Sequence, residues 1–197
     1  MDKHYHHGML KEEMIAKGLQ LLNKEGYEGF SLRKVAALCG VSHAAPYKHF
    51  KSKDELIATI TREVVAKFQA ALEESVARYG DDPQTQIVDL GKQYVKFMVE
   101  NPEYLKFLFL SNHDVTPVLF REGEIIHEDD TTFAVFAQSA VNYLVSRNAA
   151  IADRAVDILT MWCVVHGLAV LIVNNSIAYS GDYLELIEKI LREKLQF

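Results

Sequence analysis

The chain has 197 residues, of which 49% are hydrophobic and 24% are charged. This composition is that of an ordinary globular protein, and it excludes disordered, collagen-like and coiled-coil classes. Only two cysteines occur, so we do not expect a disulfide framework. We expect the protein to reside in a reducing compartment. The longest apolar run, residues 158–173, is shorter than the ~20 residues that span a bilayer. We therefore predict a cytoplasmic protein without a membrane segment.

The formal net charge of −6 hides an asymmetry along the chain. Residues 1–53 contain nine Lys or Arg and five Asp or Glu, a balance of +4, whereas the remainder has a balance of −10. Either these charges cluster by chance, or a small module that binds a polyanion is attached to an acidic body. The second interpretation predicts an N-terminal domain over 1–53 and a C-terminal domain over 54–197.

The N-terminal part of the chain has the apolar spacing of three helices. The first covers residues 10–26 and ends at a glycine. The second begins after Ser31, a favoured N-cap residue, and ends at Gly40. A third, short helix is expected over residues 42–50.

Residues 52–55 have the Ser-x-x-Glu pattern of a capping box and open a long fourth helix that residues 80–83 break. Residues 111–130, which include a proline and an acidic run, are expected to form an irregular crossing. Because no alternating strand pattern is found, the predicted fold class is all-α, with about nine helices. The remaining ones are expected over residues 87–99, 102–110, 133–144, 153–176 and 182–195.

Two short helices joined at Gly40 make residues 31–50 a predicted helix-turn-helix. Ala36 is small enough for the second helix to pack closely across the first. Gly40 can adopt a positive φ without a Cβ clash, so the chain can turn sharply. Pro46 and Phe50 are four residues apart and can both face the core.

The opposite face of residues 42–50 carries His43, Ala44, Tyr47 and Lys48, which can enter a major groove together. Lys48 and His43 can donate to guanine, and Ala44 or Ala45 can contact a thymine methyl. This pattern also fits a generic three-helix core with a solvated polar face. The agreement of the spacing, the glycine, the cap and the basic excess favours DNA binding.

Cationic residues also flank this face. Arg33 and Lys34 begin the preceding helix, and Lys53 begins the following one. A phosphate on either side of a groove would lie near these positions, where side-chain cations and helix-start amides can hold it.

The segment from Leu10 to about Ile60 resembles the N-terminal domain of the TetR family of bacterial transcription regulators. The resemblance includes S-x-R-x-V-A over 31–36, G-V-S over 40–42 and Y-K-H-F-x-x-K-x-x-L over 47–56. It implies a homodimer that binds a palindromic operator on double-stranded DNA, more often as a repressor. The implied DNA contacts, with His43 added from the face argument, are Arg33, His43, Ala44, Ala45, Tyr47, Lys48, His49 and Lys53.

The motif W-x-x-x-H-G-L-A over 162–169 is similar to the signature of a TetR subgroup whose effector domain is named for tryptophan, histidine and glycine (WHG). This resemblance implies a C-terminal helical domain that binds a small effector and joins two subunits through the last two helices. An apolar stripe on those helices is expected to form the dimer contact, with Leu159, Val165, Ile172, Leu184, Ile187 and Leu191.

An effector pocket is expected among the aromatic residues of the C-terminal domain, and it should take a small apolar or amphipathic molecule. Because the body's charge of −10 repels anions at long range, an uncharged, cationic or amphipathic apolar ligand is expected rather than a free polyanion. His166 either orients the ligand or makes a buried hydrogen bond within the core. The predicted ligand-binding residues are Tyr94, Phe97, Phe107, Phe133, Trp162 and His166.

Two other classes of protein remain as alternatives, a small all-α enzyme and a helical adaptor without specific DNA binding. The chain has no P-loop, G-x-S-x-G, H-E-x-x-H or G-x-G-x-x-G motif, so we predict that it is not an enzyme. No cofactor is predicted. A metal site near His113 and His127 is not expected either, because neither has a second histidine one helical turn away.

Overall fold

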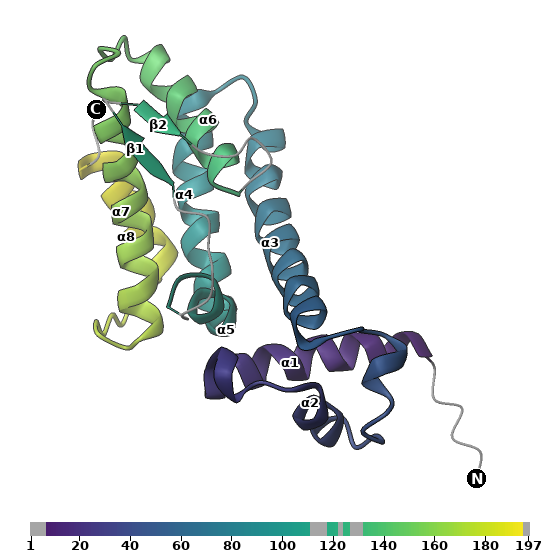
Figure 1. Ribbon diagram of the computed structural model, residues 1–197. Coiled ribbons are helices and arrows are strands. Elements are labelled where there is room, and N and C mark those ends of the chain that lie inside the picture. Colours follow the sequence, from purple (N-terminus) through teal and green to yellow (C-terminus); the bar gives the residue numbers. More distant parts are fainter. Residues whose placement is uncertain (1–6, 111–117, 122–123, 127–131, 195–197) are drawn as a thin grey trace. The chain divides into compact units, whose positions relative to one another are not determined.

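The computed structural model describes residues 7–110, 118–121, 124–126 and 132–194. Among these residues the chain is helical apart from one small sheet (Figure 1), which confirms the predicted fold class. Two compact units divide it: the described parts of Met1–Val64 with Glu103–Val115, and the described parts of Val65–Pro102 with Thr116–Phe197. The helices of the first unit are α1 (His7–Gly29), α2 (Leu32–Leu38), the 3₁₀ turn η1 (Pro46–Lys48), the start of α3 (Lys53–Arg78), α5 (Pro102–Leu105) and the π-helical η2 (Lys106–Leu110).

Local chemistry sets the ends of the first helices as the sequence predicts. Gly26 has a φ of 68° and interrupts α1. The Ser31 side chain accepts a hydrogen bond from the amide of Lys34, which caps α2. Gly40 has a φ of 65° at the turn that follows. Ser52 caps α3 by accepting from the amide of Glu55, and the Glu55 carboxylate accepts from the amide of Lys51.

The predicted third helix is shorter than expected. Instead of a helix over residues 42–50, the chain forms turns followed by the three-residue η1. Pro46 is the reason, because it has no N–H to donate to the carbonyl of Ser42. The Ser42 carbonyl instead accepts from the amide of Ala45, at 2.9 Å, so the segment tightens into i to i+3 bonds.

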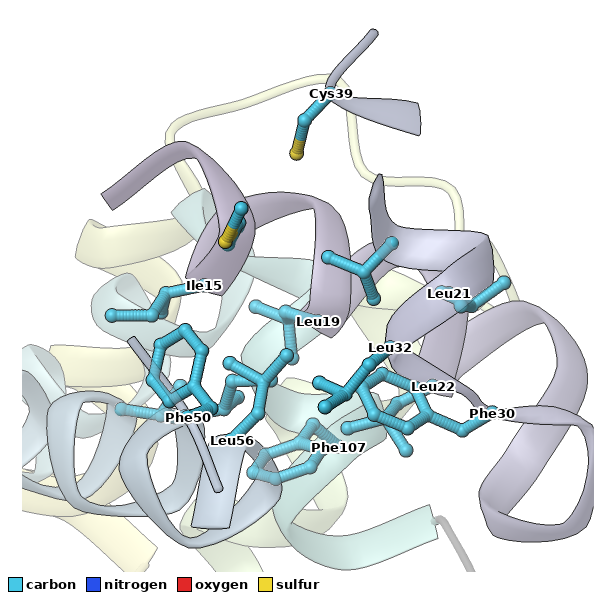
Figure 2. Packing of buried hydrophobic residues seen from close by; sticks show 14 of the residues in the cluster. Ile15, Leu19, Leu21, Leu22, Phe30, Leu32, Cys39, Phe50, Leu56 and Phe107 are labelled. Carbon is cyan, nitrogen blue, oxygen red and sulfur yellow. The ribbon is translucent and has the colours of Figure 1, made fainter. Parts of the chain in front are cut away.

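One apolar core holds the first unit together (Figure 2). Met14 and Leu19 of α1, Val35 of α2 and Leu56 of α3 belong to it. Phe107 of η2, about fifty residues further along the chain, is also part of this core and is 1% exposed. Residues beyond the predicted boundary at 53 therefore help to hold the helix-turn-helix.

The second unit is built around α4 (Pro83–Glu100), which contacts α6 (Thr132–Ser146), α7 (Arg154–Val173) and α8 (Tyr183–Lys194). The Asp82 side chain caps α4 by accepting from the amide of Thr85 at 3.0 Å. Asp182 accepts from the amide of Leu184 at the start of α8. Asp153 occupies the N-cap position of α7, but its side chain makes no capping hydrogen bond.

A two-stranded antiparallel sheet lies within the segment expected to be irregular. Strand β1 (Leu119–Arg121) pairs with β2 (Glu124–Ile126), with Phe120 opposite Ile125. Each strand has only three residues, too few for an alternating apolar pattern to be recognised in the sequence. The described residues contain eight α-helices, and the further one expected over residues 42–50 is replaced by turns and η1.

Candidate functional site

The helix-turn-helix presents most of the predicted DNA-contacting residues to solvent. Arg33 on α2, His43 and Ala44 in the turn, and Tyr47 and Lys48 on η1 are all exposed. Tyr47 is 63% exposed although it is a large aromatic residue. Packing within the fold therefore does not explain a tyrosine at this position. These five residues form the reading face, the name used for them below.

Two of the predicted contact residues lie partly inside the unit. Ala45 packs against the apolar core and is only partly exposed. His49 is half-buried, and its Nε2 atom is buried without a hydrogen-bond partner among the described residues. Their helical spacing did not reveal this, because η1 winds more tightly than an α-helix and turns these side chains inward.

Lys53 is held in place by a residue that the sequence did not single out. Its Nζ atom lies 3.8 Å from the centroid of the Tyr27 ring, within the range of a cation–π contact. The Tyr27 hydroxyl donates to the Asp54 carboxylate at 2.7 Å. The ammonium group is thus fixed beside the start of α3, where the capped amides of the first turn also lie.

Lys34, one of the two cations at the start of α2, has partners within the unit. Its Nζ atom lies 2.6 Å from Glu25 Oε2 and 2.7 Å from the carbonyl oxygen of Gly29. The hydrogen bond from Lys34 also lowers the pKa of Glu25. Arg33, the neighbouring cation, is exposed and belongs to the reading face.

Residues 103–110 follow α4 in the chain and belong to the first unit. The Asn23 side chain of α1 donates to the carbonyl oxygen of Glu103 at 2.9 Å. Phe107 fills the core of the same unit (Figure 2). Phe107, predicted to bind ligand, thus belongs to the first unit, whereas the other five residues of that list belong to the second.

Those five residues gather in the second unit, where aromatic rings pack from one helix to the next. The rings of Trp162 and Phe133 are 5.0 Å apart, and those of Trp162 and His166 are 6.3 Å apart. Tyr94 of α4 packs edge-on against Phe68 of α3, whose ring also stacks on Phe97 at 5.1 Å. The sequence thus identified a real cluster, but not Phe68, which bridges Tyr94 and Phe97.

His166 and Tyr94 form the polar centre of this cluster. The Tyr94 hydroxyl and His166 Nδ1 are 2.9 Å apart. Burial lowers the pKa of His166 and raises the pKa of Tyr94, so both groups are neutral near pH 7. This hydrogen bond is the one expected of a core histidine, and a role of His166 in orienting a ligand stays a prediction.

A cavity of about 240 Å³ lies elsewhere in this unit, between α4, α6, α7 and α8. None of the six predicted ligand-binding residues lines it. Its buried lining is apolar apart from Tyr143, which carries a hydroxyl group, whereas Gln84, Arg147 and Arg192 line it from exposed positions. The apolar walls are formed by Ile87, Val88, Phe136, Met161, Val165 and Leu191.

Helix α7 is apolar on two opposite faces. Ile158, Val165 and Ala169 are buried against its own subunit. The opposite side is open: Val156 is 63% exposed, Leu171 is 41% exposed, and a Cβ on Gly167 would meet nothing within 4 Å. This surface, defined by Val156, Thr160, Cys163, Gly167 and Leu171, is called the open face of α7 below.

The length of α7 corrects one inference from the sequence. The helix starts at Arg154, so its 20 residues are long and apolar enough to cross a bilayer, with a mean hydropathy of 2.2. The argument from length against a membrane span is therefore wrong for α7. The helix packs against α4 through buried residues such as Ile158 and Val165, but only 22% of the apolar window is buried.

The six residues of the apolar stripe predicted for a dimer contact are not equally available. Val165, Ile187 and Leu191 are buried within their own subunit, and Ile187 is completely covered. Leu159, Ile172 and Leu184 are partly exposed.

The metal site that the sequence disfavours cannot be located, because His113 and His127 lie outside the described residues.

Comparison with known proteins identifies both halves of the chain. Residues 14–60 match the family model for bacterial regulatory proteins of the tetR family. Residues 87–193, more than half of the chain, match the model for the tetracyclin repressor-like C-terminal domain. The resemblance to the WHG subgroup remains a prediction.

Relatives over nearly the whole length agree with these matches. The uncharacterized HTH-type transcriptional regulator YobS of Bacillus subtilis is 23% identical over 186 residues, which are 94% of this chain and 90% of that protein. A tetR-family regulatory protein from Rhodococcus RHA1 has a similar structure, with a TM-score of 0.66, 17% identity, and coverage of 92% and 96% of the two chains. A TetR-family regulator from Marinobacter aquaeolei VT8 gives a TM-score of 0.64 and 15% identity, with coverage of 93% and 94%. These structures show a shared fold.

Proposed function

Since the chain belongs to the TetR family of bacterial regulatory proteins and is a DNA-binding transcription regulator, we propose that it is a cytoplasmic, effector-responsive repressor. Two copies bind a palindromic operator, and a small molecule in the C-terminal unit weakens that binding. The observation that carries this proposal is the reading face, which is exposed and basic although the chain as a whole is acidic.

The reading face and the residues beside it divide into two kinds of DNA contact. Lys48 and His43 are assigned to base edges as hydrogen-bond donors, and the methyl group of Ala44 is assigned to a thymine methyl. Tyr47, Arg33 and Lys53 are assigned to the phosphates on either side. The Tyr27 ring under the Lys53 ammonium supports this assignment, because a pre-positioned cation loses less side-chain freedom on binding.

A second copy of the chain covers the open face of α7. Val156 and Leu171 are large apolar residues exposed on a helix that already packs its opposite side within the subunit. Gly167 lies between them with open space above it, so two α7 helices can approach closely there. Because a two-fold axis through this face pairs it with itself, both apolar surfaces are removed from water at once.

Residues 103–110 transmit the effector signal. They follow α4 directly, and α4 lines the cavity of the C-terminal unit. Phe107 and the bond between Asn23 and the Glu103 carbonyl fix them in the core of the DNA-binding unit. A ligand that prefers one position of α4 therefore also biases the DNA-binding unit, by no more than its differential affinity for the two states.

Selection of duplexes from a random pool by the purified chain tests the two alternatives. These are a small all-α enzyme and a helical adaptor without specific DNA binding. The proposal predicts an enriched, two-fold symmetric sequence. Its half-sites should be centred one helical turn, about 34–36 Å, or a multiple of it apart. An enzyme or an adaptor would enrich no sequence above the unselected pool. An enriched sequence without two-fold symmetry would contradict the homodimer.

A further inference from the structure

The cavity between α4, α6, α7 and α8 has a division between its interior and its rim. The buried lining is almost entirely apolar, with Val88, Phe136, Met161 and Val165 among it. The exposed lining is polar and consists of Gln84, Arg147 and Arg192. A molecule that fits both parts must itself have an apolar body and a polar end.

The charged residues that line the cavity are both cationic, in contrast to the acidic body around them. Among the described residues that line the cavity there are two arginines and neither Asp nor Glu. A guanidinium group presents a planar set of donors that matches a carboxylate, and it does not lose its charge at any physiological pH. The net charge of the body opposes a distant polyanion, whereas a carboxylate at the cavity rim would meet these two guanidinium groups at contact distance.

Arg192 is positioned by a network that joins its own helix, α8, to α4. Its Nε atom lies 2.9 Å from Glu188 Oε1, and the other oxygen of Glu188 accepts a hydrogen bond from Lys92. These two hydrogen bonds lower the pKa of Glu188, so the carboxylate stays ionised. Its charge is shared between Lys92 and Arg192, so these three side chains together carry one positive charge, which also acts on Asp82.

We propose that this cavity binds a small amphipathic carboxylate, with its apolar tail between α4 and α7 and its carboxylate at Arg147 and Arg192. The inference rests on the proposed function, because it names the chemical class of the effector. It also moves the effector from the aromatic cluster, where Tyr94 and His166 already bind each other, to a separate cavity with space.

The test compares three probes that share one eight-carbon chain: octanoate, 1-octanol and octylammonium. Titration calorimetry on the full-length protein should show octanoate binding about tenfold or more tightly than either other probe, as expected for a charge-assisted bond. Arg147→Gln and Arg192→Gln should each remove about that factor for octanoate and leave 1-octanol unchanged. Lys189→Gln is the matched control, because Lys189 is an exposed cation of α8 that does not line the cavity.

Equal binding of all three probes, a preference for octylammonium, or full octanoate affinity in both arginine variants would overturn the proposal. Operator affinity measured without any probe is a separate readout. If it is intact while octanoate does not bind, the carboxylate proposal fails and the proposed DNA-binding function stands. If octanoate binds and the operator is not recognised, the proposed function fails. Octanoate that binds at the arginines without weakening the operator complex overturns its role as an effector.

Discussion

At the scale of single residues, the pair of His166 and Tyr94 shows how a buried polar group becomes part of the core. Two neutral groups 2.9 Å apart satisfy one another, so neither is left as an unpaired buried polar atom. Protonating His166 at low pH would place a charge among the rings of Tyr94 and Trp162, where burial opposes it. The bond therefore has a pH dependence that can be measured.

We expect the wild-type protein to lose more stability than His166→Gln between about pH 7.5 and about pH 5.5. Because the pKa of His166 is lowered in the folded state, the unfolded chain binds the extra proton first as the pH falls below its ordinary value of 6.5. The free energy of unfolding thus falls by at most about 1.4 kcal/mol for each unit of decreasing pH. It stops falling below the pKa that His166 has in the folded state. Melting temperatures across this range provide the measurement, with His43→Gln at an exposed histidine as the control. Parallel curves for wild type and His166→Gln would show that His166 does not titrate in this way.

The sequence identified both members of this pair but not their contact. Helical spacing assigns a residue to a face, and it does not say which residue of another helix lies across from it. The same limit explains Lys34, which was assigned to DNA and is bound to Glu25, and Tyr27, which was missed under Lys53. The exposed residues of the reading face were easier to predict, because they need no partner within the fold.

At the scale of elements, α7 shows that one helix can serve two surfaces. A helix at the edge of a globular unit normally has one apolar stripe and one polar face. In α7 the residues on the open face are apolar or small, as are the buried ones on the opposite side. The sequence predicted the helix and its role in a dimer. It could not tell which stripe was internal, because both are apolar.

The open face gives a direct prediction about assembly. Leu171→Glu should shift the protein from dimer to monomer in sedimentation, because the dimer would bury an unpaired charge on both sides of the two-fold axis. Val145→Glu is the matched control, since Val145 is a 50% exposed apolar residue on α6 and lies off this face. Ile187 is unsuitable for this test, because it is fully buried within the subunit and a charge there would unfold it. A wild-type monomer at micromolar concentration, or an unchanged dimer in Leu171→Glu, would contradict the proposed interface.

At the scale of the whole molecule, the chain places a cationic reading face on a protein with a net charge of −6. The all-α fold and the helix-turn-helix could be predicted because caps, glycines and apolar spacing all act locally. The division into units could not, since Phe107 joins the N-terminal core from far along the chain. The cavity could not either, because its lining comes from four helices and no short motif encodes it.

The central claim is that this reading face binds DNA specifically, and it is tested most directly by operator affinity as a function of salt. The measurement compares the selected operator with a scrambled duplex for wild type, Lys48→Ala, Lys53→Ala and the control Lys189→Ala. Lys48→Ala should cost about 1–3 kcal/mol on the operator and little on the scrambled duplex, since it removes a base contact. Lys53→Ala should weaken binding to both duplexes and lower the salt slope by about one per subunit, since it removes a phosphate contact. If both variants bind the operator as wild type does, the reading face does not read the operator. If wild type does not distinguish the two duplexes, the chain does not bind DNA specifically.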